Sequence, residues 1–206
     1  MTALNNVSSL AYKIKTPAVK INTCAQLEAL FLGRRLPNQA VSGRYKVDVK
    51  YLDDFCDFCH LDLYIPEGVS LKITGQPAPP KAKGAGNFMN NEHRLDIHVA
   101  EGGKFKAKGF SFFSVTNNGG SVKVGYLDKY IANGSAEHIA KAKIEKVYTA
   151  SLNGVTKTDV KGRAHKVVAE GNASGTIKDA HIVEKPDSSK LKIKNVDKET
   201  NYTYLG

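Results

Sequence analysis

The sequence predicts a mainly β protein, an OB-like barrel or a β-sandwich with one short N-terminal helix. Many short stretches alternate between apolar and polar residues, and glycine, proline and asparagine separate them at fairly regular intervals. The chain has 206 residues, which is long enough for one substantial core. We therefore expect a single domain over residues 1–206, with an OB-like core at 40–150 and a β extension at 151–206.

One segment near the N-terminus has the features of a helix. Thr23 and Gln26 have the spacing of a capping box. Leu27 and Phe31 belong to an apolar stripe with helical spacing, and Gly33 is a suitable C-terminal stop. The sequence thus predicts a helix between Thr23 and Gly33.

The remaining elements are predicted to be strands. Residues 44–51 alternate strictly, with tyrosine and valine on one side and charged residues on the other. We expect hairpins joining 104–115 to 121–130 and 140–150 to 162–169, although 135–142 could instead form a short helix. Residues 75–92 are rich in proline and glycine and predict a long loop, and we find no internal repeat. The other predicted strands are 61–65, 69–74, 94–99, 177–183 and 191–196.

The charge of the chain favours an anionic partner. The formal net charge is +10 and the isoelectric point is about 9.4. Nucleic acids, anionic membranes and acidic proteins are the common partners of such proteins, although a solvated lysine-rich surface has the same composition. No apolar stretch is long enough to span a membrane, and the first 20 residues lack a signal-peptide core. The three cysteines fit a reducing compartment, so we expect a cytoplasmic protein, in its own cell or in a host.

Residues 104–115 carry the strongest functional signal. On a strand, Lys104, Lys106, Lys108, Phe110 and Phe112 share one face, while the other face is apolar or small and suits a core. Exposing a phenylalanine forfeits roughly 1.5–3 kcal/mol of burial, whereas a stacked base returns about 1–3 kcal/mol and lysines follow the phosphates. This arrangement predicts a single-stranded nucleic-acid site. The alternative is a strand buried on both faces, with the lysines at its solvated end.

Two motifs resemble nucleic-acid-binding families. Residues 108–113, Lys-Gly-Phe-Ser-Phe-Phe, resemble the RNP1 motif of cold-shock domains and RNA-recognition modules, and the similarity continues to Val122-Lys123-Val124. The resemblance implies that Phe110 and Phe112 stack on bases and that Lys108 contacts a phosphate. It covers about 25 of the 206 residues, the second motif lacks its aromatic and histidine, and the chain has no tryptophan.

A further stretch is similar to another group of proteins. Residues 43–49 resemble an early strand of phage single-stranded DNA-binding proteins with an OB-fold. Those proteins commonly end in an acidic tail, whereas this sequence ends in lysine-rich and then tyrosine-containing segments.

A cysteine-rich segment raises the question of a metal site. Cys56-Asp57-Phe58-Cys59-His60 matches the c-type haem attachment pattern, but that attachment needs export. Zinc bound by Cys56, Cys59, His60 and Cys24 is the better metal hypothesis. On an extended strand, however, Cys56 and Cys59 point to opposite faces, which favours buried free thiols.

No catalytic signature accompanies the six histidines, so we expect a non-enzymatic protein without a cofactor or a metal. The predicted function is sequence-tolerant binding of single-stranded DNA or RNA. The alternative is a structural protein of a virus particle or filament, such as a capsid, decoration or tail component. The sequence leaves open whether the chain forms a homo-oligomer. The predicted nucleic-acid-binding residues are Lys104, Lys106, Lys108, Phe110, Phe112 and Lys123.

Overall fold

The computed structural model describes residues 17–31, 42–48, 60–75, 94–108 and 113–202. Strands dominate this part of the chain, with one short helix near its start. The helix is α1 (Cys24–Phe31), and the strands are β1 (Val19–Ile21), β2 (Gly43–Asp48), β3 (His60–Ile65), β4 (Val69–Thr74), β5 (Arg94–Val99), β6 (Lys104–Lys108), β7 (Phe113–Asn118), β8 (Ser121–Gly134), β9 (Ala140–Gly154), β10 (Thr156–Glu170), β11 (Ala173–Pro186) and β12 (Lys190–Tyr202).

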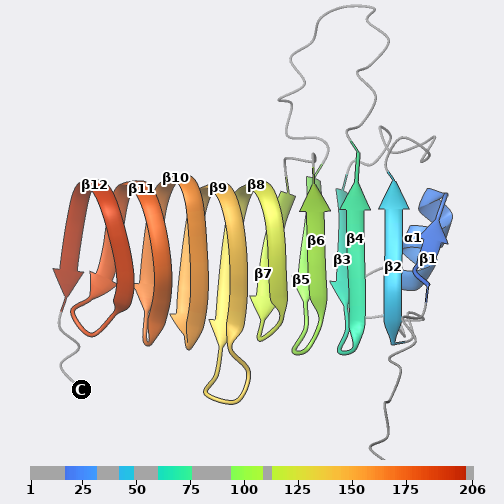
Figure 1. Cartoon of the computed structure of the whole chain (residues 1–206), viewed down its shortest axis with the longest axis horizontal. Helices are drawn as coiled ribbons and strands as arrows, with labels where there is room; N and C mark the ends of the chain where they lie inside the picture. The colour runs from blue at the N-terminus through green and yellow to red at the C-terminus, as the bar shows by residue number, and fades with distance from the viewer. Residues whose placement is uncertain (1–16, 32–41, 49–59, 76–93, 109–112, 203–206) are drawn as a thin grey trace, which may run out of the picture.

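The strands wind into a parallel β-solenoid. Every strand pair among the described residues is parallel, and each strand pairs with its counterpart in the next coil. Figure 1 shows the coils stacked side by side along the long axis. The predicted OB-like barrel or β-sandwich is therefore wrong, because those folds are built from largely antiparallel neighbours. Only the mainly β composition and the single short helix are confirmed.

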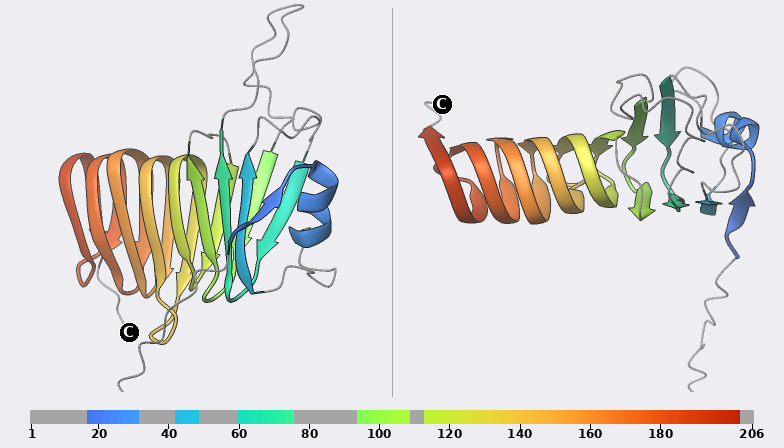
Figure 2. Two further views of the ribbon diagram at one scale, coloured as in Figure 1. Left: turned by 45° about the vertical axis from the view of Figure 1, so that its right-hand side comes forward. Right: turned by 90° about the horizontal axis from the view of Figure 1, so that it is seen from above.

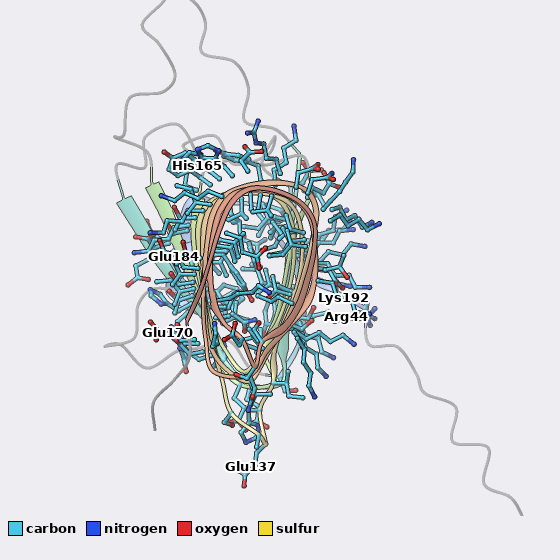
Figure 3. All side chains as sticks on the ribbon, turned by 90° about the vertical axis from the view of Figure 1, so that its left-hand side faces the viewer. Arg44, Glu137, His165, Glu170, Glu184 and Lys192 are labelled. Atoms are coloured by element: carbon cyan, nitrogen blue, oxygen red, sulfur yellow. The ribbon has the colours of Figure 1, made fainter. Side chains whose placement is uncertain are left out.

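Each coil contributes to two faces of the rod. The first face is formed by β1, β2, β4, β6 and the first halves of β8 to β12. The second face is formed by β3, β5, β7 and the second halves of the same long strands. The view along the axis in Figure 3 shows the resulting flattened oval, and Figure 2 shows the rod from above.

The coils have a nearly constant length in the C-terminal part. Lys141 pairs with Lys157, Lys157 with Ser174, and Ser174 with Lys190, so the chain returns to the same position after nearly equal intervals. The chain thus repeats in structure, although no internal repeat is expected from the sequence. Residue 150, the predicted end of the barrel core, falls inside β9, and β10 to β12 continue the same stack.

Apolar side chains fill the interior of the solenoid. Leu71, Phe105 and Val122 pair in register and are almost completely buried. At the N-terminal end, α1 packs on the coils through Leu27 and Phe31, which are fully buried. The predicted cap is confirmed, since the Gln26 backbone N–H donates to Thr23 Oγ1 at 3.2 Å. The Asn22 backbone N–H also donates to Gln26 Oε1, at 2.9 Å.

Both predicted hairpins are wrong. Residues 104–115 are not one strand but parts of β6 and β7, and each of these pairs with β8 in parallel. β9 and β10 do pair, again in parallel. Asn153-Gly154 turns the chain into the next coil, and the positive φ of 70° at Gly154 fits that corner. The alternative helix at 135–142 is also absent, because β9 already begins at Ala140.

Several sequence-based predictions lie outside the described residues. They include Phe110, Phe112, Cys56, Cys59 and almost all of the predicted loop at 75–92. His60 begins β3 and Cys24 begins α1, but their side chains are not described.

Candidate polyanion-binding face

A straight column of lysines crosses the first face of the solenoid. Parallel pairing without offset places equivalent residues of successive coils beside one another, about 4.8 Å apart. One outward-facing position is lysine in six neighbouring strands, from β1 to β9. We call this column the lysine ladder: Lys20, Lys46, Lys72, Lys106, Lys123 and Lys143.

A second basic column lies beside the first. Its residues stand two positions earlier in each strand, so they point outward on the same face. In this column serines alternate irregularly with basic residues. We call it the second ladder: Arg44, Ser70, Lys104, Ser121, Lys141, Lys157, Ser174 and Lys190.

The lysines of both ladders are exposed and form no ion pair with an acidic side chain of the described residues. The burial pattern places each of them at the surface. The ion pairs between described lysines and acids lie elsewhere, as in Lys166–Glu184 at 2.9 Å and Lys185–Glu199 at 3.1 Å. The charge of this face is therefore available to an external partner.

The opposite face has a different character. In Figure 3, Arg44 and Lys192 lie on one long side of the oval, while Glu170 and Glu184 lie on the other. Asp62 on the second face pairs with His98, with 2.7 Å between Oδ1 and Nε2. Acidic residues thus accompany the basic residues on the second face, as in Lys166–Glu184 and Lys185–Glu199.

The lysine ladder has a defined end. In β10 the equivalent position is Asp159, which stands beside Lys143 in register. Its Oδ1 atom accepts a hydrogen bond from the Thr176 backbone N–H at 3.0 Å. Lys192 resumes the column only in β12, beside Thr176.

A shallow depression lies where the two ladders are densest. Its volume is about 340 Å³. Five lysines and one aspartate provide most of its polar lining. They are Lys106, Lys123, Lys141, Lys143, Lys157 and Asp159.

The structure brings together part of the predicted site. Lys104 and Lys106 point outward while Phe105 and Ala107 are buried, as the alternation of this strand predicts. Lys106 pairs in register with Lys123. Lys108 ends β6, but its side chain is not described, and the two predicted stacking phenylalanines lie outside the described residues.

The sequence reasoning missed the rest of the face, although a signal for it exists. A lysine flanked by residues with buried side chains recurs along the chain. The triplets are Tyr45-Lys46-Val47, Leu71-Lys72-Ile73, Phe105-Lys106-Ala107, Val122-Lys123-Val124 and Ala142-Lys143-Ile144.

A second cluster lies at the corner between the two faces. Tyr148 stacks on His165 with ring centroids 4.5 Å apart, and His165 stacks on His181 at 5.1 Å. His181 Nδ1 lies 2.9 Å from Asp197 Oδ2, and this hydrogen bond lowers the pKa of the Asp197 carboxyl. The stack joins successive coils and is marked by His165 in Figure 3.

The described residues contain no group of three or more His, Cys, Asp or Glu side chains that could hold a metal ion. Within the same part of the chain, no helix is long and apolar enough to cross a membrane. No protein-family model, curated protein or solved structure matches the chain.

Proposed function

We propose that this protein binds single-stranded nucleic acid without sequence preference and without catalysing a reaction. The observation that supports the proposal is the straight ladder of exposed lysines on one face of the solenoid. Contacts between lysines and phosphates carry no sequence information directly, which fits binding without sequence preference.

The shape of the ladder favours a flexible chain over a rigid duplex. Six lysines at about 4.8 Å spacing extend over about 24 Å. The phosphates of duplex DNA follow a helix with a turn of about 34 Å, so each strand meets a straight line only about once per turn. A single strand can instead adjust its backbone and bring a phosphate to successive lysines along the whole ladder.

The energetic cost of the ladder also points to a ligand. Like charges directly opposite each other on neighbouring strands destabilise a sheet. The ladder contains five such lysine pairs, and Lys141–Lys157 adds another. A bound polyanion relieves this repulsion, which gives a physical reason for keeping the lysines in one column.

The test compares oligonucleotides and charge variants. Fluorescence anisotropy with labelled (dT)20 and a 20-base-pair duplex should show tighter binding of the single strand and a steep loss of affinity with salt. The variant Lys106→Gln/Lys123→Gln should weaken (dT)20 binding about tenfold and reduce the salt slope by about 1.4, or 0.7 per lost phosphate contact. The matched control is Lys129→Gln/Lys198→Gln, which removes two lysines from the second face.

Three results would contradict the proposal. The duplex could bind as tightly as (dT)20, or both double variants could lose affinity equally. A sulfated polysaccharide such as heparin could also bind far more tightly than an oligonucleotide of equal charge. That last result would assign the face to another class of polyanion.

The alternative, a structural protein of a virus particle or filament, requires assembly of the rods. The outer edge of β12 ends the stack of described strands. One register for antiparallel pairing of β12 with a second copy places Val196 opposite Val196. That register places Lys194 opposite Lys198 and Ile193 opposite Glu199, which opposes self-association. Assembly into filaments in analytical ultracentrifugation would nevertheless favour the structural function.

A further inference from the structure

The two ladders differ at β10. The lysine ladder is interrupted there by Asp159, whereas the second ladder keeps Lys157 in the same strand. Lys157 is exposed and pairs in register with Lys141. A polyanion that follows the lysine ladder from β1 therefore meets the negative charge of Asp159 directly after Lys143. The positive charge of Lys157 lies in the same strand, two residues before Asp159.

Asp159 is held in this place. Its Oδ1 atom accepts the Thr176 backbone N–H at 3.0 Å, and the residue is half-buried between the coils. This hydrogen bond favours the side-chain conformation in which the carboxylate stays beside the column. A phosphate at this position would lie within the Debye length of about 8 Å and would be repelled.

The depression of about 340 Å³ spans both columns in β8, β9 and β10, up to the strand that carries the interruption. It includes Lys123 and Lys143 of the lysine ladder, and Lys141 and Lys157 of the second ladder. Asp159 also lines the depression, in the same strand as Lys157.

We propose that Asp159 sets the path of the bound chain, deflecting it from Lys143 of the lysine ladder to Lys157 of the second ladder. Lys192 belongs to the same column as Lys143 but lies beyond the interruption, so it does not contact the ligand. This inference rests on the proposed function insofar as it requires an extended polyanion on the first face. Beyond the proposed function, the inference assigns the bound polyanion a path across the face and names Asp159 as the residue that sets this path.

The central experiment compares two substitutions with the same change of charge. Binding of labelled (dT)20 to the full-length chain is measured by anisotropy over a range of salt concentrations. Lys157→Gln should weaken binding about threefold to tenfold and lower the salt slope by about 0.7. Lys192→Gln, the matched control, should change the affinity by less than about twofold, because a residue off the path neutralises no phosphate.

A third variant tests Asp159 itself. Asp159→Asn keeps a carbonyl oxygen that accepts the Thr176 N–H but removes the charge. It should strengthen (dT)20 binding about threefold and reduce the effect of Lys157→Gln in the double variant, because the straight path is no longer repelled. A thermal melt of each variant shows whether it is folded. The comparison of Lys157→Gln with Lys192→Gln leaves Asp159 intact and remains decisive if Asp159→Asn folds poorly.

The outcomes separate this inference from the proposed function. The proposed path is wrong if Lys157→Gln and Lys192→Gln lose the same amount of (dT)20 affinity, or if folded Asp159→Asn binds (dT)20 more weakly than wild type. Neither result contradicts nucleic-acid binding itself. Inorganic polyphosphate is the second probe. If the wild type binds polyphosphate but not (dT)20, and Lys157→Gln alone weakens that binding, the path holds and the nucleic-acid function fails. Absence of binding to either probe at low salt overturns both.

Discussion

Replacing Lys123 with glutamine should stabilise the free protein while weakening its binding to a polyanion. Lys123 stands between Lys106 and Lys143 in the lysine ladder, and all three are exposed. With ammonium groups about 7 Å apart in water, each neighbour repels Lys123 by about 0.6 kcal/mol. The substitution should therefore raise the free energy of unfolding by about 1.2 kcal/mol at low ionic strength.

Salt should reduce this gain in a predictable way. At physiological ionic strength the Debye length is about 8 Å, which leaves about 0.5 kcal/mol. In 1 M salt the Debye length of about 3 Å leaves only about 0.1 kcal/mol. Urea titrations of wild type and Lys123→Gln at three salt concentrations measure these differences directly. Thermal melts at low salt should show an increase in Tm of about 2–4 °C.

Lys129→Gln provides the matched control. Lys129 lies in the same strand, is also exposed, and has the uncharged neighbours Ser114 and Thr149 in register. Its replacement changes the net charge equally but relieves no neighbouring lysine. The reasoning is refuted if the two variants have the same stability at low salt, or if Lys123→Gln destabilises the protein.

Further predictions concern other parts of the chain. Burial raises the pKa of Tyr130 from 10.0 to about 12. Its neutral form therefore stabilises the fold below pH 10, and this stability, on the order of 3 kcal/mol, is lost as the pH rises from 10 through about 12. The stability difference between wild type and Tyr130→Phe should change by that amount in urea titrations across this range, because all other groups are common to the two proteins. If Phe110 and Phe112 stack on bases, the variant with both replaced by alanine should lose about 2–6 kcal/mol of binding free energy in the anisotropy assay and keep its melting temperature. Elemental analysis should find no stoichiometric zinc, and one zinc per chain would instead support Cys56 and Cys59 as ligands.

The alternation of the sequence predicted strands well but not their partners. Residues 69–74 and 94–99 are β4 and β5 with the predicted bounds. Alternation records only which side chains face a core, and it is the same for parallel and antiparallel strands. The motif Asn153-Gly154 is a strong hairpin signal, yet it turns the chain at a corner of the solenoid instead. The local sequence therefore encodes strands and turns, whereas the direction in which the strands pair depends on how all the coils stack.

The basic face was only partly predictable for a related reason. The lysines of the ladder follow one another at irregular distances in the sequence. The intervals from Lys46 to Lys72 and from Lys72 to Lys106 are much longer than the interval from Lys106 to Lys123. Residues outside the described part lengthen the first two intervals, so no constant period appears. Treating 104–115 as one strand detected Lys104 and Lys106, and the similarity that continues to Val122-Lys123-Val124 added Lys123, but the lysines of the other coils were missed.

The solenoid architecture itself leads to a final prediction, that one whole coil can be removed. β10 contains a bulge that shifts its register against both neighbours. On the first face, Ala140 pairs with Thr156, which pairs with Ala173. On the second face, Ala150 pairs with Val167, which pairs with Val183. The interval in sequence from β9 to β11 is therefore the same on both faces.

The register shift of β10 against β9 is opposite to its shift against β11, so the two shifts cancel. β9 and β11 therefore have one constant register relative to each other on both faces. Deleting residues 156–172, the whole of β10 and the turn that follows it, should join β9 directly to β11 as a regular coil without a bulge. In a solenoid each coil contacts mainly its neighbours, so the loss in stability should be that of one coil. For a segment of this length the loss is on the order of 1–2.5 kcal/mol.

The control deletion removes only residues 156–163, about half a coil. It would bring residues of the second face onto the first and place outward side chains in the core, so this variant should not fold. Circular dichroism and cooperative thermal unfolding distinguish the two. Failure of the whole-coil deletion to fold, or equal behaviour of both deletions, would show that β10 is not an interchangeable unit. A folded deletion would show that stability is additive along the rod, and it would bring Lys143 beside Thr176 with no aspartate between them.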